Sequence, residues 1–270
     1  MNEFMCGIAG YEIGERSSLD RTLAVQSLLA GIAERGADAV GYAFREHSGT
    51  VVVRKQRTGA SALLETVALG AATAQALVHV RDYTKGHPTV AANNHPIRHG
   101  AVVGIHNGII ENDDELFERH GLDRAEPEMT VDSEAIFALV DTYGTTPEVL
   151  GQLRGAMAAA WIDERTPALL HVARGVGRPL WLGKGRHEIL FASTRAALDV
   201  ASETLRIPLR MREVPEGRLL SLSGGRVVGE RRFDPDRTYR DRHNLPAVRA
   251  PHEGRSCLER LAVLAAGSPA

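Results

Sequence analysis

The second half of the chain consists of one strand-like segment after another, and this succession limits the possible folds more than any other feature. From Gly155 onward, apolar or β-branched segments occur at 156–162, 168–173, 180–182, 189–192, 209–214, 218–221 and 226–230. A single helical pattern, at 195–204, interrupts them. Consecutive strands without crossover helices pair through hairpins, so the pattern predicts an α+β layered domain with largely antiparallel sheets.

The first half supplies most of the helices. Ser17 with Asp20 resembles a capping box that opens a helix ending near Gly36. Further helices are predicted at 61–68, after Asn112 and after Thr130. Strands are predicted at 8–13, 40–45, 50–54, 75–81 and 101–106, and a loop at 82–100. Taken alone, the dipeptide at 107–108 predicts a hairpin turn, because Asn-Gly favours the backbone of a two-residue turn.

Composition excludes several classes of protein. The chain has 270 residues, 43% of them hydrophobic, which is enough to bury a substantial core. Its 32 basic and 34 acidic residues give a net charge of -2, so neither nucleic acid nor an anionic membrane is an expected partner. No export signal or apolar segment of spanning length is present, and the cytoplasm is the expected location. Cys6 and Cys257 lie at opposite ends, so we expect no disulfide framework.

Cys6 lies almost at the start of the chain and admits more than one interpretation. It could be a small buried thiol of the first strand, since unpaired cysteine is often buried. Lipid modification after a signal peptide is excluded, because the residues before Cys6 provide neither a basic start nor an apolar stretch. If residues 1–5 are absent from the working protein, the free α-amine of Cys6 can serve as a base for its own thiol.

Six short motifs occur in an order that favours the catalytic interpretation. They are MCGIAG (5–10), RGADAVG (35–41), HVRDYTKG (79–86), NNHP (93–96), HNGIIEN (106–112) and TVDSEAI (130–136). Together they resemble the glutaminase domain of class II glutamine amidotransferases, which are N-terminal nucleophile hydrolases. HNGIIEN is most similar to the amino-sugar synthase branch. The resemblance covers 6–233 and implies a four-layer αββα sandwich.

The resemblance also implies a mechanism and its residues. Cys6 would be the nucleophile, with the side-chain amide of Asn107 and the backbone N–H of Gly108 as the oxyanion hole. Arg81 would bind the α-carboxylate of L-glutamine and Asp132 its α-ammonium group, with Thr84 lining the pocket. Alternatively, Arg81 and Asp132 form an ordinary ion pair, or Asp132 caps a helix. Arg35 and Asp38 would support the loop beside the nucleophile.

Five histidines between residues 79 and 106 raise the possibility of a metal site. They are His79, His87, His95, His99 and His106. Their spacing matches no zinc signature, so we expect no metal, and the resemblance implies no cofactor. We interpret His79, His95 and His106 instead as hydrogen-bonding groups inside the pocket wall.

The chain also departs from the family pattern. Asp82 and Lys85 stand where amino-sugar synthases carry an aromatic residue and a histidine. No synthase domain follows Phe233, which is succeeded by a C-terminal extension at 234–270, an extended arm with a short helix at 256–265. Ammonia is therefore expected to pass to a separate synthase chain, and a homo-oligomer is possible. Residues 1–5 are expected either to precede the true start or to be removed.

Three functions remain open from the sequence. The first is a glutaminase that releases glutamate and ammonia from L-glutamine through a γ-glutamyl thioester on Cys6. The second is an amidohydrolase acting on another γ-glutamyl amide. The third is a catalytically silent module that senses glutamine or serves as a scaffold, which retention of residues 1–5 would favour.

Overall fold

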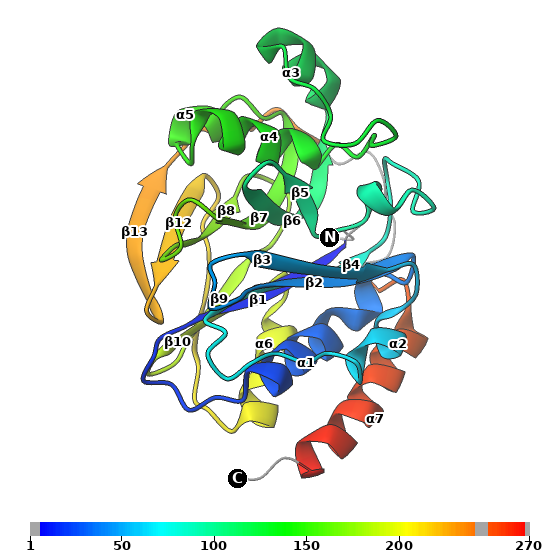
Figure 1. The fold of residues 1–270 in the computed structure, drawn as a ribbon, viewed down its shortest axis with the longest axis vertical. Coiled ribbons are helices and arrows are strands. Elements are labelled where there is room, and N and C mark those ends of the chain that lie inside the picture. Colours follow the sequence, from blue (N-terminus) through cyan, green and yellow to red (C-terminus); the bar gives the residue numbers. More distant parts are fainter. Residues whose placement is uncertain (1–5, 241–247, 268–270) are drawn as a thin grey trace.

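The computed structural model describes residues 6–240 and 248–267. These residues form two sheets stacked face to face between two layers of helices (Figure 1). The seven-stranded sheet has the order β11-β9-β10-β1-β4-β2-β3. Its strands are β1 (Gly7–Ile13), β2 (Ala39–Arg45), β3 (Val51–Gln56), β4 (Gln75–Arg81), β9 (Trp181–Lys184), β10 (Glu188–Ala192) and β11 (Arg210–Glu213).

The six-stranded sheet has the order β13-β12-β8-β7-β6-β5. Its strands are β5 (Ile97–His99), β6 (Val102–Ile110), β7 (Gly155–Asp163), β8 (Leu170–Arg174), β12 (Arg218–Ser223) and β13 (Arg226–Arg232). Neighbouring strands in both sheets run antiparallel. The antiparallel α+β architecture predicted from the sequence is therefore confirmed.

Each sheet has its own helical layer. The helices on the seven-stranded sheet are α1 (Arg21–Ile32), α2 (Ala60–Leu64), α6 (Arg195–Leu205) and α7 (Pro251–Gly267). Those on the six-stranded sheet are α3 (Asp113–His120), α4 (Glu134–Tyr143) and α5 (Pro147–Leu150). Two segments form short 3-10 helices. η1 (Ala33–Arg35) directly follows α1, and η2 (Ala91–Asn93) precedes β5. The result is the expected four-layer αββα sandwich.

Alternation along the strands divides the apolar side chains among three cores. In β1, Ile8 lies in the core between the sheets, whereas Ala9 and Tyr11 pack toward the helices. Leu77 of β4 and Ile105 of β6 also lie between the sheets. Successive side chains of a strand point to opposite faces, so every second residue counted from Ile8, Leu77 and Ile105 also projects between the sheets. The candidate site contains residues placed in this way.

The turn expected at Asn107-Gly108 is wrong. β6 continues through both residues, and Gly108 pairs with Met157 of β7. Gly108 has φ 147°, and a Cβ there would lie 1.9 Å from the carbonyl oxygen of Ala156. The glycine is therefore required by a close approach between two strands, not by a turn.

The capping box expected at Ser17 is also wrong. Asp20 is the N-cap of α1, and its side chain accepts a hydrogen bond from the backbone N–H of Leu23 at 2.9 Å. Ser17 instead donates a hydrogen bond to Glu188 of β10. The short β5 lies within the segment predicted to be a loop, and α5 was not predicted.

The C-terminal helix is longer than the sequence pattern indicates. It begins at Pro251 rather than near residue 256, and its Cys257 and Leu261 are 0% and 3% exposed against the helical layer. Residues 1–5 and 241–247, to which part of the sequence interpretation refers, lie outside the described residues. No helix in the described ranges combines the length and apolar character that a membrane span requires.

Candidate active site

The site lies where several strands end between the two sheets. Gly7 of β1 pairs with Val80 of β4, so Cys6 and Arg81 lie at the same end of this strand pair. Cys6 shares its face with Ile8, and Arg81 shares its face with Leu77, so both side chains project between the sheets. In β6, Asn107 follows Ile105 on the same face. Strand parity thus directs three predicted site residues toward one region.

A small pocket brings most of the predicted residues together. Cys6, Arg81, Thr84, Gly108 and Asp132 all line it. The other lining residues are Asp82, Tyr83, Lys85, His95, His106, Val131 and Ser133. They come from the start of β1, the loop after β4, β6 and the segment before α4. Far larger cavities, such as one beside Glu12 at the other end of β1, are lined by none of the predicted site residues.

Cys6 is half-buried, and both its thiol and its backbone carbonyl are hydrogen-bonded. Its thiol donates a hydrogen bond to the backbone carbonyl of Asp82, with Sγ and O 3.3 Å apart. Nε of Arg35 donates to the carbonyl of Cys6 at 3.2 Å. Burial raises the pKa of the thiol to about 11, with Arg81 opposing the shift. The thiol is therefore protonated near neutral pH and needs a base to become a nucleophile.

Asn107 is buried without a hydrogen-bond partner for its amide. The residue is 0% exposed, and neither Nδ2 nor Oδ1 has a partner among the described residues. Leaving a buried polar group unsatisfied costs about 1–3 kcal/mol, so such a group in a native fold calls for an explanation. An amide kept free for a ligand atom provides one.

Arg81 is held by the loop that follows its own strand. Nη1 donates to Oδ1 of Asn94 at 2.6 Å, and Nη2 donates to the carbonyls of Lys85, at 2.9 Å, and Gly86. The residue is 2% exposed and lines the pocket. These contacts fix the plane of the guanidinium, which suits it to bind a carboxylate.

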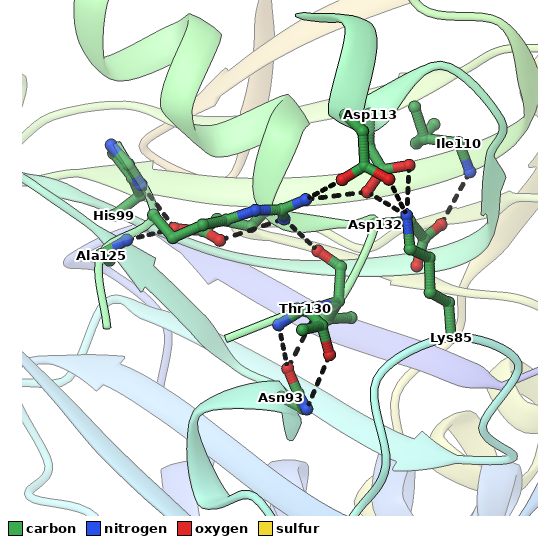
Figure 2. Close-up of polar contacts among 12 residues, drawn as sticks. Lys85, Asn93, His99, Ile110, Asp113, Ala125, Thr130 and Asp132 are labelled. Atoms are coloured by element: carbon green, nitrogen blue, oxygen red, sulfur yellow. Dashed lines mark hydrogen bonds and ion pairs between the residues drawn. The ribbon is translucent and has the colours of Figure 1, made fainter. Parts of the chain in front are cut away.

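Asp132 is buried in the pocket lining, just before α4. Its Oδ2 accepts a hydrogen bond from the backbone N–H of Ile110 at 2.7 Å (Figure 2). Burial raises its pKa to about 6, and nearby Lys85 opposes this shift. Its side chain neither caps α4 nor pairs with Arg81, so both alternatives for Asp132 are wrong.

The residues expected to support the nucleophile contact the neighbouring loop. The backbone N–H of Asp38 donates to the carbonyl of Arg81 at 3.1 Å, and Oδ2 of Asp38 accepts from the N–H of Tyr83 at 3.0 Å. Arg35 reaches the carbonyl of Cys6, as described above. Thr84 lines the pocket on its exposed side.

Three neutral histidines lie at or near the pocket, of which His95 and His106 line it and His79 does not. Nε2 of His79 lies 3.1 Å from the carbonyl of His106, and Nε2 of His106 lies 3.3 Å from that of Ala156. Carbonyls only accept, so each Nε2 carries the proton, and Nδ1 of His106 accepts from Ser133 at 2.8 Å. Burial lowers the pKa of His79 and of His106 to about 3.

His95 differs from what the sequence led us to expect. Its ring stacks on that of His79 with centroids 4.2 Å apart, but neither ring nitrogen has a partner among the described residues. Burial lowers its pKa well below the usual value. The other two histidines face different groups, since His87 contacts Thr89 and His99 pairs with Glu134. Within the described chain, no cluster of three His, Cys, Asp or Glu side chains suits a metal ion.

Sequence reasoning missed the two asparagines of the NNHP motif as site residues. Asn94 orients Arg81, and its Nδ2 donates to the carbonyl of Pro88 at 2.8 Å. Oδ1 of Asn93 accepts from the N–H groups of Thr130 and Val131 at 2.8 and 3.1 Å, which fixes the segment that carries Asp132 (Figure 2). The motif marked the segment, but these contacts join distant parts of the chain and have no local signature.

A charged cluster surrounds Lys85, which lines the pocket. Nζ of Lys85 lies 2.7 Å from Oδ2 of Asp113 and 2.9 Å from Oδ2 of Asp114. Arg124 contacts both of these carboxylates and also Glu134, which is 0% exposed. The loop after β4 is thereby attached to the start of α3 and to α4.

Comparison with known proteins gives consistent results. Residues 79–200 match a family model described as a glutamine amidotransferase domain. The glutamine–fructose-6-phosphate aminotransferase (isomerizing) of Bradyrhizobium diazoefficiens is 33% identical over 214 residues, covering 74% of this chain and 33% of that protein. The corresponding enzyme of Mycobacterium tuberculosis is 34% identical over 212 residues, covering 72% and 32%. The chain thus spans about a third of the length of these curated relatives.

A solved structure shares the fold. The glutamine phosphoribosylpyrophosphate amidotransferase of B. subtilis, complexed with ADP and GMP, superimposes with a TM-score of 0.67. It covers 85% of this chain and 49% of its own, at 21% sequence identity.

Proposed function

The chain belongs to the class II glutamine amidotransferases, and we propose that it hydrolyses the side-chain amide of L-glutamine through a γ-glutamyl thioester on Cys6, releasing glutamate and ammonia. The observation that carries this proposal is the convergence of Cys6, Arg81, Gly108 and Asp132 on one pocket, beside the buried unpartnered amide of Asn107. Each is suited to a different part of the substrate.

Activation of the thiol requires a base, and among the described residues no side chain is hydrogen-bonded to Sγ. The polar contact of Sγ within the described residues is with a carbonyl, and the pKa of the thiol is raised to about 11. A free α-amine on Cys6, with a pKa of about 7.7 to 8.0, would accept the thiol proton directly or through a water molecule. The catalytic form is therefore proposed to begin at Cys6, without residues 1–5.

The bonds then change in two stages. The thiolate attacks the side-chain amide carbon of glutamine, and the carbonyl π electrons move onto oxygen, where Asn107 Nδ2 and the N–H of Gly108 stabilise the oxyanion. The protonated amine gives its proton to the leaving nitrogen, the C–N bond breaks, and ammonia departs. Water attacks the resulting thioester, which restores the Cys6 thiol and releases glutamate.

Recognition of the amino acid uses the two buried charges. Arg81 is proposed to bind the α-carboxylate, which would exchange with one of its present carbonyl partners. Asp132 is proposed to bind the α-ammonium group, and a positive charge beside it would lower its pKa from about 6. Thr84 lines the same pocket.

The ammonia is proposed to serve a synthase carried by a partner chain. Support comes from the relatives, which are named as aminotransferases acting with glutamine on fructose-6-phosphate and extend well beyond the matched region. The domain proposed to catalyse the hydrolysis spans 6–233, with 234–270 as a C-terminal extension.

A glutamate-release assay on two forms of the chain tests the proposal. One form begins at Cys6, verified by mass spectrometry of the intact protein, and the other retains residues 1–5. We expect glutamate and ammonia in equal amounts from the first form, about 10²- to 10⁴-fold less from the second, and none from Cys6→Ala. Absence of glutamate from the form beginning at Cys6 would refute the proposal, and equal activity of the two forms would refute the role of the amine.

Competition distinguishes the substrates. Glutamine and a series of γ-glutamyl amides are offered together to the form that begins at Cys6. The proposal requires a higher kcat/KM for glutamine. Preference for another γ-glutamyl amide would reassign the substrate while leaving the nucleophile and the oxyanion hole in place.

A further inference from the structure

The C-terminal segment returns to the side of the molecule that carries the nucleophile. The backbone N–H groups of Arg249 and Ala250 both donate to the carbonyl of Glu34 in η1, each at 2.9 Å. The next residue in η1 is Arg35, whose Nε donates to the carbonyl of Cys6. Residues close to the two ends of the chain are therefore joined through one short 3-10 helix.

α7 is docked firmly enough to hold this segment in place. Figure 1 shows it beside α1 and α2. A Cβ on Gly254 would lie 3.0 Å from Cβ of Glu34, so the helix approaches η1 closely. Oε2 of Glu253 accepts from the N–H of Ser61 at 2.8 Å and caps α2, whose own N-cap residue is a glycine. Cys257 is fully buried against the same layer.

Arg249 also reaches the residue that contacts the thiol. Its Nε lies 3.2 Å from Oδ2 of Asp82, and the side chain of Asp82 is 13% exposed. The backbone carbonyl of Asp82 accepts the hydrogen bond from Sγ of Cys6. Burial raises the pKa of Asp82, and Arg249 opposes the shift. The ion pair therefore contributes to fixing both the position and the charge of Asp82.

We propose that Arg249 is a positioning residue of the active site, which acts through its ion pair with Asp82 to hold the carbonyl that orients the thiol of Cys6. The C-terminal segment is then part of the catalytic apparatus and not only an appendage. The expected effect of Arg249 on glutamine turnover rests on the proposed function. Its expected effect on the reactivity of the Cys6 thiol does not.

The charges around Cys6 determine whether a substitution raises or lowers the pKa of its thiol. Arg81 favours the thiolate, whereas Asp82 and Asp132 disfavour it. Asp82 in turn faces Arg249, Asp38 and Arg35. Removing Arg249 takes away a positive charge that partly offsets the Asp82 carboxylate, so the pKa of Cys6 should rise. Removing the carboxylate with Asp82→Asn lowers it, so the two variants shift the thiol in opposite directions.

Alkylation of Cys6 by iodoacetamide measures the thiol without any substrate. The full chain is treated from about pH 6 to pH 10, and peptide mass spectrometry separates Cys6 from Cys257. We expect Arg249→Ala to slow alkylation about threefold to tenfold at a fixed pH and Asp82→Asn to accelerate it, a shift of up to about one pKa unit. Arg249→Lys restores most of the rate, and the double variant behaves like Asp82→Asn alone.

Arg260→Ala is the matched control, because Arg260 of α7 forms an ion pair with Glu65, the residue that follows α2. It should alkylate like the parent protein. In the glutamate assay, Arg249→Ala should lower kcat while KM stays unchanged, since Arg249 does not line the pocket.

Two results would overturn the inference: unaltered alkylation in Arg249→Ala, or an equal shift in Arg260→Ala, which would indicate loosening of the whole helix. If the alkylation rates change as expected but no form releases glutamate, the positioning role stands and the proposed function fails.

Discussion

Among single residues, Asn107 combines complete burial with an amide that has no partner in the described chain. Asn107→Leu replaces that amide with an apolar group of similar volume. We expect kcat for glutamine hydrolysis to fall about 10²- to 10³-fold, because a proposed oxyanion donor is lost. The midpoint of urea unfolding should stay the same or rise, because an unsatisfied buried amide is removed.

Asn112→Leu is the matched control for this substitution. Asn112 is also buried, but its amide is satisfied, since Nδ2 donates to the carbonyl of Gln152 and Oδ1 accepts from the N–H of Arg154. The control should lose stability and keep its kcat. A large loss of stability in Asn107→Leu would show that its amide has a structural partner and contradict the oxyanion assignment.

Protonation of Asp132 should affect stability and activity in opposite directions. As pH rises, its contribution to stability decreases while activity increases. Its pKa rises from 3.8 in the unfolded chain to about 6 in the fold, so between these values the folded state binds more protons. Its contribution to the free energy of unfolding therefore decreases as pH rises through this window, by up to about 3 kcal/mol in total. The proposed recognition of the glutamine ammonium group by Asp132 needs the carboxylate, so kcat/KM should fall below about pH 6.

Asp132→Asn separates these two effects. An asparagine can still accept from the N–H of Ile110 but does not titrate. Urea unfolding at several pH values gives the free energy of unfolding of both proteins. The difference, variant minus parent, should increase as pH rises from about 4 to 6 and stay constant above that window. KM for glutamine at neutral pH should rise about 10- to 100-fold. Parallel stability curves for the two proteins would contradict the pKa shift.

Sequence alone could identify the charged and nucleophilic residues of this pocket, but not how they are held. Cys6, Arg81 and Asp132 lie in short motifs and converge on one pocket. Asn93 and Asn94 were missed as site residues, because their partners are backbone groups of other segments, brought close only by the fold.

At the scale of elements, the loop after β4 holds Arg81 in place and is itself attached to α3. Lys85 ties it to Asp113 and Asp114 at the start of α3, and the carbonyl of Lys85 accepts from Arg81. We expect Lys85→Met to raise KM for glutamine about threefold to tenfold with little change in kcat, because the loop that holds Arg81 is released.

Asp114→Asn is the corresponding control, since the side chain of Asp114 is 79% exposed and such surface pairs contribute little. Steady-state kinetics with glutamine checks both variants. A fall in kcat at constant KM in Lys85→Met would mean that the loop acts on the chemical step rather than on binding.

Most strands and helices follow from local patterns, and the exceptions show where tertiary contacts decide. Asn107-Gly108 favours a turn locally, but pairing along β7 keeps both residues in β6. Ser17 has the right spacing for a helix cap, yet the side chain of Asp20 takes that position. β5 has only the three residues Ile97–His99, too few to display an alternating pattern, and it exists through its pairing with β6.

At the scale of the whole molecule, α7 joins the C-terminal segment to the helical layer through Cys257 and Leu261. Leu261→Ala should lower the free energy of unfolding by about 2–4 kcal/mol in a single cooperative transition, because a buried side chain leaves a cavity. Val263→Ala is the control, since Val263 is 74% exposed, and it should change stability by less than about 0.5 kcal/mol.

Urea unfolding followed by circular dichroism checks both variants. Equal stability of Leu261→Ala and the parent protein would mean that α7 unfolds separately from the sandwich.

The central place of β1 in its sheet also bears on the order in which a growing polypeptide can become an enzyme. β1 is synthesised well before its neighbour β10, since Ala9 pairs with Ala192. During synthesis the strand that carries the thiol has one free edge until β10 arrives, and Arg249 follows later still. We therefore expect a nascent chain to release no ammonia before β10 has been synthesised.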